Sequence, residues 1–334
     1  MSVKFSYSRL EQYNNCPYAY NLKYNEGLYI NTPNVAAPFG SLVHKIYEQI
    51  ITMIKNGRPV NYDVLKRDFV EMNLPKRNKY DRTGDLFGTK VLAEKYPSQW
   101  VDFSSKGGKS YSMRAKEFLE SGIYLPEKYC NEHPELEVVG AEIGFEFEYR
   151  DYVFMGFIDR VMKVRGEDSY VIFDIKTKDS PYQEKELTTP LQHMIYCRAL
   201  RGMYGKDIEI NCYYELPFVD GGIWQHAGTK GFEARGLKKI DKLLDGIEAG
   251  EFPPSPSPIC HWCPYEISEN IPPEVQGHEC IYGSLWTPEN HTFETRYEWK
   301  GVEGHEKQWE KYQEDKAVAN GYSFRKDKGW DIEF

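Results

Sequence analysis

The chain has 334 residues, 40% of them hydrophobic, and a formal net charge of −9. This length suits one large domain or one domain with a sizeable insertion, and the 26 tyrosines and 7 tryptophans exclude an intrinsically disordered chain. Proteins that wrap DNA non-specifically are usually basic, so any contact with nucleic acid here must depend on a local basic groove.

The sequence contains no apolar run of about 18 residues, so we expect no transmembrane helix. Residues 1–6 lack the apolar core of a signal peptide. We therefore expect a cytoplasmic protein that does not bind membranes. In a reducing compartment, its 7 cysteines should be thiols or metal ligands rather than disulfides.

Helices are predicted in the first part of the chain. Ser8 and Glu11 form a capping box at the start of a first helix. An apolar stripe at helical spacing predicts a second helix at residues 40–55. Residues 57–135 are polar and interrupted by glycine and proline, and we interpret them as a mostly helical insertion.

The pattern then changes to the alternation that is typical of strands. The expected elements are strands at 137–150, 152–164 and 169–177, a helix at 190–203, a strand at 208–216 and a helix at 232–249. This order favours an α/β fold with a small mixed sheet flanked by helices. We divide the chain into N-terminal helices of the core (1–56), the insertion (57–135), the catalytic sheet with its helices (136–252) and a cysteine-containing segment with a polar tail (253–334).

The sharpest motif joins an aspartate on one predicted strand to Asp-x-Lys on the next. Asp159 ends a Gly-x-Ile-Asp stretch, and Asp174 and Lys176 follow an apolar run. A hairpin would let the two acids meet at the end of the sheet, with Asp174 and Lys176 on one face. An Asp-x-Lys motif alone would more often lie on the solvated rim of a sheet. Here the preceding apolar run and the Gly-x-Ile-Asp strand favour a functional site instead.

Carboxylates are the ligands that Mg²⁺ and Mn²⁺ prefer. Such a metal polarises a phosphodiester and lowers the pKa of a bound water molecule. A neighbouring lysine can orient that water or stabilise the charge that develops on the phosphate. The motif therefore predicts metal-dependent hydrolysis.

In these motifs the sequence resembles the PD-(D/E)XK nucleases of the RecB and AddB type, which include the CRISPR-associated exonucleases. Five motifs occur in the family order: Ser-x-Ser-Arg-Leu leading to Cys-Pro (6–17), Gly-x-x-x-His (40–44), Gly-x-Ile-Asp (156–159), Asp-x-Lys (174–176) and Gln-x-x-x-Tyr (192–196). Each motif is weak alone, whereas all five in order are specific. The resemblance implies a restriction-endonuclease-like core with a helical insertion over the cleft.

The resemblance also implies roles for the matching residues. Lys176 would be the catalytic lysine, and the metal would be bound by His44, Asp159, Asp174 and the carbonyl of Ile175. Gln192 and Tyr196 lie one helical turn apart and would contact DNA or orient the lysine. Glu142 is either an accessory acid or an ordinary surface residue of its strand.

Several members of the family bind a 4Fe–4S cluster through one N-terminal and three C-terminal cysteines, which match Cys16, Cys260, Cys263 and Cys280. Four thiolates suit such a cluster. However, 16 residues separate Cys263 from Cys280, whereas the last spacing in the family is short. Zinc bound by the same thiolates, with His261 or His278 as a substitute, is an alternative, and so is no metal at all.

We therefore expect a metal-dependent exonuclease acting on single-stranded DNA or DNA ends in recombination, repair or phage DNA processing. The insertion would arch over the cleft and admit only a single strand. Two alternatives stay open: an endonuclease with the same site, and a non-catalytic DNA-binding subunit. The intact Asp159, Asp174, Lys176 and His44 argue against the second. The sequence does not identify protein partners.

Overall fold

The computed structural model describes residues 3–30, 36–73, 111–255, 257, 259–260, 263–265, 280, 323–325 and 329–331. The chain forms two compact units, Met1–Tyr7 with Pro33–Ile240 and Ser8–Thr32 with Asp241–Phe334. No helix within the described ranges is long and apolar enough to cross a membrane. The cytoplasmic location and the boundaries expected after residues 56, 135 and 252 stay predictions.

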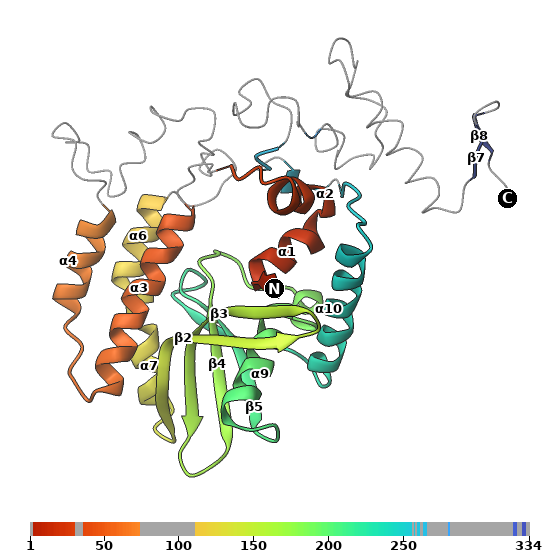
Figure 1. Ribbon diagram of the computed structural model, residues 1–334. Coiled ribbons are helices and arrows are strands. Elements are labelled where there is room, and N and C mark those ends of the chain that lie inside the picture. The colour runs from red at the N-terminus through yellow and green to blue at the C-terminus, as the bar shows by residue number, and fades with distance from the viewer. Residues whose placement is uncertain are drawn as a thin grey trace, which may run out of the picture. The chain divides into compact units, whose positions relative to one another are not determined.

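The first unit is built on a mixed six-stranded sheet (Figure 1). The strands follow the order β1 (Val3–Phe5), β3 (Tyr152–Val164), β4 (Ser169–Ile175), β5 (Glu209–Leu216) and β6 (Ile223–Ala227), and β2 (Leu136–Tyr149) pairs with β3 off this path. The β1–β3 and β4–β5 pairs are parallel, and the other pairs are antiparallel. The predicted α/β fold with a mixed sheet is confirmed.

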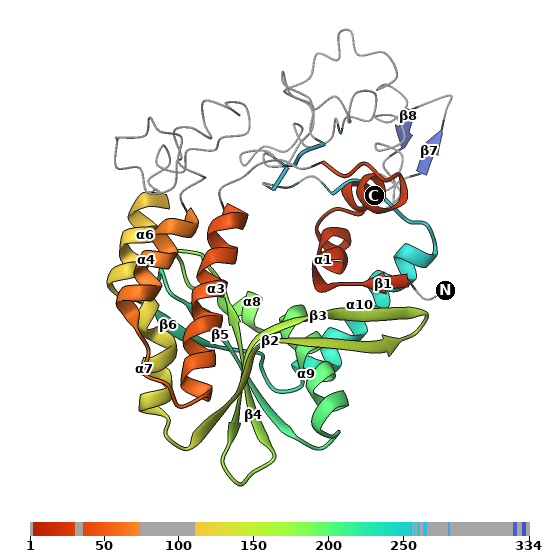
Figure 2. The ribbon, with the colours of Figure 1, turned by 60° about the vertical axis from the view of Figure 1, so that its left-hand side comes forward.

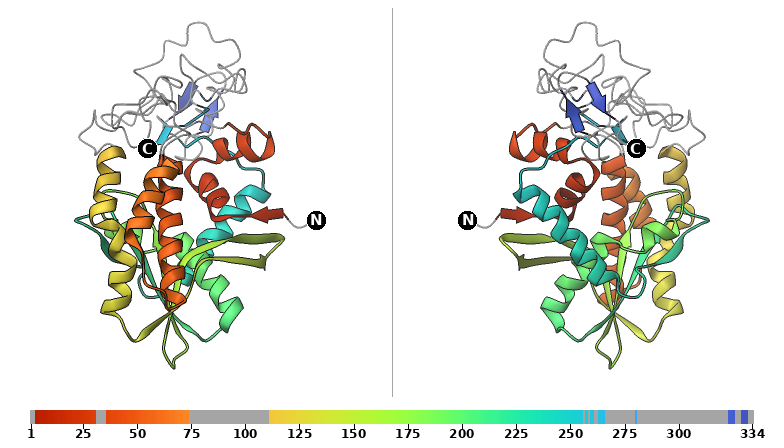
Figure 3. Two further views of the ribbon diagram at one scale, coloured as in Figure 1. Left: turned by 90° about the vertical axis from the view of Figure 1, so that its left-hand side faces the viewer. Right: turned by 90° about the vertical axis from the view of Figure 1, so that its right-hand side faces the viewer.

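Helices α3 (Ala36–Lys55) and α4 (Tyr62–Asn73) lie next to the sheet beside a column in which α6 (Tyr111–Glu120) and α7 (Leu125–Glu132) follow each other end to end, as Figures 2 and 3 show. The apolar stripe of α3 is buried in their common core, in which Val43, Ile46 and Ile50 are fully buried. Ile175, at the end of β4, belongs to the same core. This packing holds α3 against the end of the strand that carries the Asp-x-Lys motif.

Helix α9 (Leu191–Tyr204) also packs on the sheet, through contacts between its His193 and Tyr214 of β5 and between its Tyr196 and Phe145 of β2. All 7 residues of β4 are buried. A strand that is buried throughout must be covered on both faces, which explains why its sequence is a continuous apolar run rather than an alternating one. Two further helices are α8 (Glu184–Leu187) and α10 (Phe232–Glu248).

Some local expectations were wrong or incomplete. Helix α1 (Tyr7–Asn15) begins one residue before Ser8, so Ser8 lies inside its first turn and Ser6 stands before the helix. Strands β1 and β6 were not expected, because runs of 3 and 5 residues are too short to show alternation. Within residues 57–135, the described part up to Glu132 consists of helices and short connections. One of these helices is the short 3-10 helix η3 (Gly122–Tyr124). Residues 74–110 lie outside the described residues, so the arch stays a prediction.

The second unit joins the N-terminal segment Ser8–Thr32 to the last part of α10 and the segment that follows it. It contains α2 (Pro17–Tyr20) and the π-helix η1 (Asn21–Asn25). The buried Tyr13 hydroxyl donates to the Glu251 carbonyl at 2.7 Å, and the buried Tyr265 hydroxyl donates to the Leu28 carbonyl at 2.7 Å. Both hydroxyls satisfy backbone oxygens of the other segment, so they fix the two segments together.

A buried ion pair ties β3 to β5 in the first unit. Arg160 Nη2 lies 3.1 Å from Glu215 Oε1, and the two side chains are 1% and 0% exposed. The guanidinium carbon lies 3.7 Å from the centroid of Phe173, on the intervening strand β4. The Trp224 indole donates a hydrogen bond to Glu215 Oε1 at 3.0 Å. The pair therefore spans three strands and fixes them in one register.

Replacing Arg160 by methionine should lower the free energy of unfolding by about 3–5 kcal/mol, because Glu215 would be left buried without its counter-charge. Urea denaturation followed by circular dichroism measures the change. The double variant Arg160→Met/Glu215→Leu should be closer to wild type than Arg160→Met alone. Lys116→Met is the control: this lysine is 72% exposed and should contribute less than about 1 kcal/mol. Equal stability of Arg160→Met and Lys116→Met would contradict the role of the pair.

Candidate metal and catalytic site

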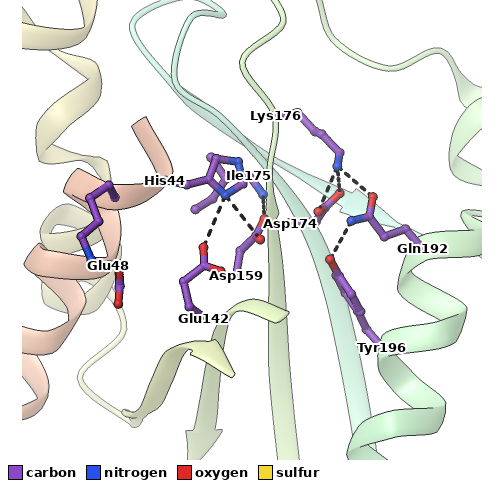
Figure 4. A network of polar contacts seen from close by, with 10 residues as sticks. His44, Glu48, Glu142, Asp159, Asp174, Ile175, Lys176, Gln192 and Tyr196 are labelled. Carbon is purple, nitrogen blue, oxygen red and sulfur yellow. Dashed lines mark hydrogen bonds and ion pairs between the residues drawn. The ribbon is translucent and has the colours of Figure 1, made fainter. Parts of the chain in front are cut away.

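Polar side chains from five elements of the first unit meet at the end of β4 (Figure 4). They are His44 of α3, Glu142 of β2, Asp159 of β3, Asp174 and Lys176 at the end of β4, and Gln192 and Tyr196 of α9. Residues that are 152 positions apart in sequence, from 44 to 196, therefore share one site. The strands, α3 and α9 each contribute part of it.

The first half of the site is a cluster of His44, Glu142 and Asp159, whose ligand atoms all lie within 4.8 Å of one another. His44 Nδ1 lies 3.4 Å from Asp159 Oδ1 and 3.6 Å from Glu142 Oε1. Burial by itself would lower the pKa of His44, but the hydrogen bonds to Asp159 and Glu142 outweigh it and raise the pKa to about 10. Protonated His44 is a cation between two carboxylates, and a divalent metal bound there would replace the proton.

Asp159 is held where the ladder between β3 and β4 ends. The last backbone pair of this ladder is Arg160 with Phe173. Asp159 directly precedes Arg160 on β3, and its Oδ2 accepts a hydrogen bond from the backbone N–H of Ile175 on β4 at 2.7 Å. A side chain thus replaces a backbone partner, which orients the carboxylate and leaves its other oxygen directed toward His44 (Figure 4).

The second half of the site is a hydrogen-bonded chain that starts at Asp174. Lys176 Nζ lies 2.9 Å from Asp174 Oδ2 and donates to Gln192 Oε1 at 2.8 Å. Gln192 Nε2 in turn donates to the Tyr196 hydroxyl at 2.6 Å. Asp174 and Lys176 are neighbours on the strand face, as the alternation predicts. This chain fixes the lysine ammonium from two sides.

Burial and neighbouring charges shift the pKa values of Asp174, Lys176 and His193. Asp174 is fully buried, and burial together with the charge of Asp159 raises its pKa in spite of Lys176. For Lys176, burial lowers the pKa, but Asp174 and Asp159 outweigh it and raise the pKa to about 12. The neighbouring His193 is also fully buried, and burial lowers its pKa to about 4. His193 is therefore neutral, and Lys176 supplies the positive charge beside Asp174.

The cluster opens into a pocket of about 840 Å³. One face of α3 and the ends of the strands line this pocket, among them His44, Lys45, Glu142, Phe157, Ile175 and Lys176. The opening makes the His44 cluster and the lysine accessible to one bound molecule.

The structure places the residues expected from the sequence in two groups. His44 and Asp159 lie together, and Asp174, Lys176, Gln192 and Tyr196 form the adjacent chain. Glu142, for which the sequence left two interpretations open, lies in the His44 cluster. It has a φ of +47°, which is uncommon for a non-glycine residue, and no sequence pattern reveals such a conformation.

The four cysteines expected to share a cluster all belong to the second unit. Cys16 stands at the N-cap of α2, where its sulfur accepts the N–H of Ala19 at 3.5 Å. In the Cys-x-x-Cys motif, the Cys263 N–H donates to the Cys260 carbonyl at 2.9 Å, which closes a tight turn.

Cys280 lies next to this turn. Its N–H donates to the carbonyl of Tyr265 at 2.5 Å, and Tyr265 follows Cys263 by two residues. The long spacing between Cys263 and Cys280 therefore still allows a backbone contact of Cys280 two residues beyond Cys263. Among the described residues, no three of the four cysteine sulfurs lie within 4.8 Å of one another. Tyr265 also bonds to Leu28, which links the C-terminal cysteines to the segment that carries Cys16.

A family model described as the PD-(D/E)XK nuclease superfamily matches residues 4–268. Among solved structures, one described as "Putative exonuclease" from Eubacterium rectale is similar at 11% identity, with 82% of this chain and 92% of that chain covered and a TM-score of 0.42. The structure of SSO0001 is similar at 14% identity, with 58% and 81% covered and a TM-score of 0.29. These two likenesses are too distant to carry an argument. No curated protein matches the chain.

Replacing Glu142 by alanine should weaken Mn²⁺ binding by at least about tenfold, as should His44→Ala, because each removes a group from the cluster. Isothermal titration calorimetry with Mn²⁺ measures the affinity. Glu146→Ala removes an exposed acid from the same strand and should leave the affinity unchanged. If Glu142→Ala binds Mn²⁺ as tightly as Glu146→Ala does, Glu142 is an ordinary surface residue.

Proposed function

Since the chain belongs to the PD-(D/E)XK nuclease superfamily, whose members use divalent metals, we propose that it is an exonuclease that hydrolyses single-stranded DNA or DNA ends. One observation carries the proposal. The His44 cluster and the Asp174–Lys176 pair lie side by side at the end of β4, next to a single pocket. Metal ligands and a fixed ammonium are the two parts that phosphodiester hydrolysis needs.

In this proposal Mg²⁺ or Mn²⁺ is held by His44, Asp159, Asp174 and the Ile175 carbonyl, with Glu142 as a further ligand. Carboxylate oxygens with one imidazole fit a hard divalent cation. The shifts in pKa support the fit, because three neighbouring carboxylates raise the pKa of His44 and a bound cation would relieve their repulsion. When bound, the metal would polarise the phosphate and make a water molecule more acidic.

The remaining residues would position the lysine and stabilise charge on the phosphate. Lys176 stays charged, since its pKa is raised to about 12, and would stabilise negative charge on the phosphate that reacts. Gln192 holds Lys176 through its amide oxygen, and the Tyr196 hydroxyl holds Gln192. Gln192 therefore holds the ammonium alongside its contact with Asp174, which Lys176 keeps at 2.9 Å.

The choice of DNA ends or single strands rests on the resemblance to the CRISPR-associated exonucleases and on the expected arch formed by residues 57–135. A nuclease with this preference would suit recombination, repair or phage DNA processing. An acidic protein needs local cations for such a substrate. The pocket contains Lys45, which pairs with Glu48, and Lys176, which pairs with Asp174, and both would contact phosphate.

We also propose a 4Fe–4S cluster bound by Cys16, Cys260, Cys263 and Cys280. Their common unit and the return of Cys280 to Tyr265 support a shared site. The thiolate donors suit iron. Because the first cysteine lies near the start of the chain and the others near its end, the cluster would staple the two segments of the second unit together.

The nuclease activity is tested with end-labelled single-stranded, duplex and circular DNA in Mn²⁺ or Mg²⁺. EDTA should abolish cutting, and Asp174→Ala and Lys176→Ala should each slow it by at least about a hundredfold, because both act on the transition state. Lys163→Ala, on the same hairpin but paired with Asp168, should cut at the wild-type rate. Cutting of the circle would identify an endonuclease. Robust cutting in EDTA, or by Lys176→Ala, would contradict the mechanism.

For the cluster, protein purified without oxygen should be brown and contain about four irons per chain. Cys16→Ala should bleach it and lower its melting temperature. Cys130→Ala, which removes a half-buried thiol of the first unit, should change neither colour nor iron content. A colourless protein with about one zinc per chain would favour the zinc alternative instead.

A further inference from the structure

An exposed aromatic ring stands at the edge of the candidate site. Phe157 of β3 is 60% exposed and lines the same pocket as His44, Glu142 and Lys176. Its neighbour Ile158 is fully buried. Single exposed apolar residues are common on protein surfaces. A large ring beside a cluster of metal-ligating groups, however, faces any molecule that binds in the pocket.

The ring has room around it. Phe157 pairs across the strands with Gly144 of β2, and a Cβ added at Gly144 would lie 3.4 Å from the ring. Gly144 is itself exposed. The ring therefore rests on bare backbone, which supports it without covering it. A larger residue at position 144 would press against the ring and shield part of it.

We propose that Phe157 is a stacking platform for one base of a single-stranded substrate, next to the phosphate that is cut. The proposal rests on the proposed nuclease function and specifies its substrate. Phe157 precedes Asp159 by two residues, about 7 Å along an extended strand. That distance is comparable with the spacing of neighbouring nucleotides in an extended single strand, so a base beside the reacting phosphate can reach the ring.

The chemistry of the pocket fits an unpaired strand. Any base has a π-face, so a phenyl ring accepts all four bases and gives no sequence preference. A base within a duplex already stacks on both neighbours, so the ring favours bases that are unpaired or at an end. Lys45 and Lys176 also line this pocket, Lys45 paired with Glu48 at 2.7 Å and Lys176 paired with Asp174 at 2.9 Å. The Lys45 side chain is 52% exposed, so it can also contact a phosphate beside the base.

A stacking ring contacts the base and not the reacting atoms, so it should bind the ground state and the transition state equally. Phe157→Ala should therefore raise KM for single-stranded DNA by about tenfold and leave kcat nearly unchanged. Phe157→Trp and Phe157→Tyr should keep the wild-type KM. Phe157→Leu keeps an apolar side chain over Gly144 but has no aromatic face, and should behave like Phe157→Ala.

The decisive experiment moves one abasic site along a single-stranded oligonucleotide and measures kcat and KM with Mn²⁺. For the wild type, one position of the abasic site should raise KM by about tenfold, and for Phe157→Ala the same position should have no effect, because the partner of the ring is already absent. Met155→Ala is the matched control. Met155 is exposed on the same strand but does not line the pocket, so the abasic profile should stay as in wild type.

The outcomes separate this inference from the proposed function. If the wild type cuts and Phe157→Ala keeps both the KM and the abasic profile of the wild type, the stacking role is wrong and the nuclease remains. If Phe157→Ala instead lowers kcat at constant KM, the ring acts on the metal site and the stacking role is again wrong. If the wild type cuts none of the oligonucleotides, the proposed function itself fails and the inference fails with it.

Discussion

The crowding of carboxylates at the end of β4 sets the conditions for the rest of the site. Of the three carboxylates there, Glu142 and Asp159 share a cluster with His44, and the pKa of Asp174 is raised by burial and by the charge of Asp159. Two cations, His44 and Lys176, offset them, and the pKa of each is raised as a result. Together these groups link α3, β2, β3, the end of β4 and α9 through contacts between charged or polar side chains. A bound divalent cation would fit this balance because it takes the place of the proton on His44.

Consecutive residues of β3 serve the two sides of the sheet. Asp159 turns to His44 and to the N–H of Ile175, whereas Arg160 turns to the buried Glu215. A slip of one residue in the pairing of β3 with β4 would exchange the two side chains, placing a carboxylate in the core and a guanidinium in the site. The buried ion pair is thus a register device as well as a source of stability. It also explains why the aspartate of the Gly-x-Ile-Asp motif is followed by arginine rather than by another apolar residue.

The sequence predicted the β3–β4 hairpin, α3 and α9 well, because these elements are long, regular in period and carry the motif residues. The predicted bounds 152–164 agree with those of β3. Strands β1 and β6 were not predicted, because runs of 3 and 5 residues are too short to show the alternation of a strand. The position of Glu142 depends on a left-handed backbone and on a register shift between Val138 and Gly140, and the contact of Cys280 with Tyr265 joins residues 15 positions apart. Neither is a local property of the sequence. Phe157 occupies the unspecified position of the Gly-x-Ile-Asp motif, and only the structure shows that its ring is exposed.

A net charge of −9 leaves the protein little general attraction for nucleic acid. A broad basic surface binds DNA by releasing many counterions, and its affinity then falls steeply with salt. The pocket of this protein instead concentrates a few interactions: two lysines, the metal-ligating cluster and one exposed aromatic ring. Stacking is insensitive to salt and to base identity, so it can hold a strand where electrostatic attraction is weak. If Phe157 stacks as proposed, the protein would hold DNA only where a phosphate and an unpaired base reach the site together, and its net negative charge would repel strands that do not enter the site.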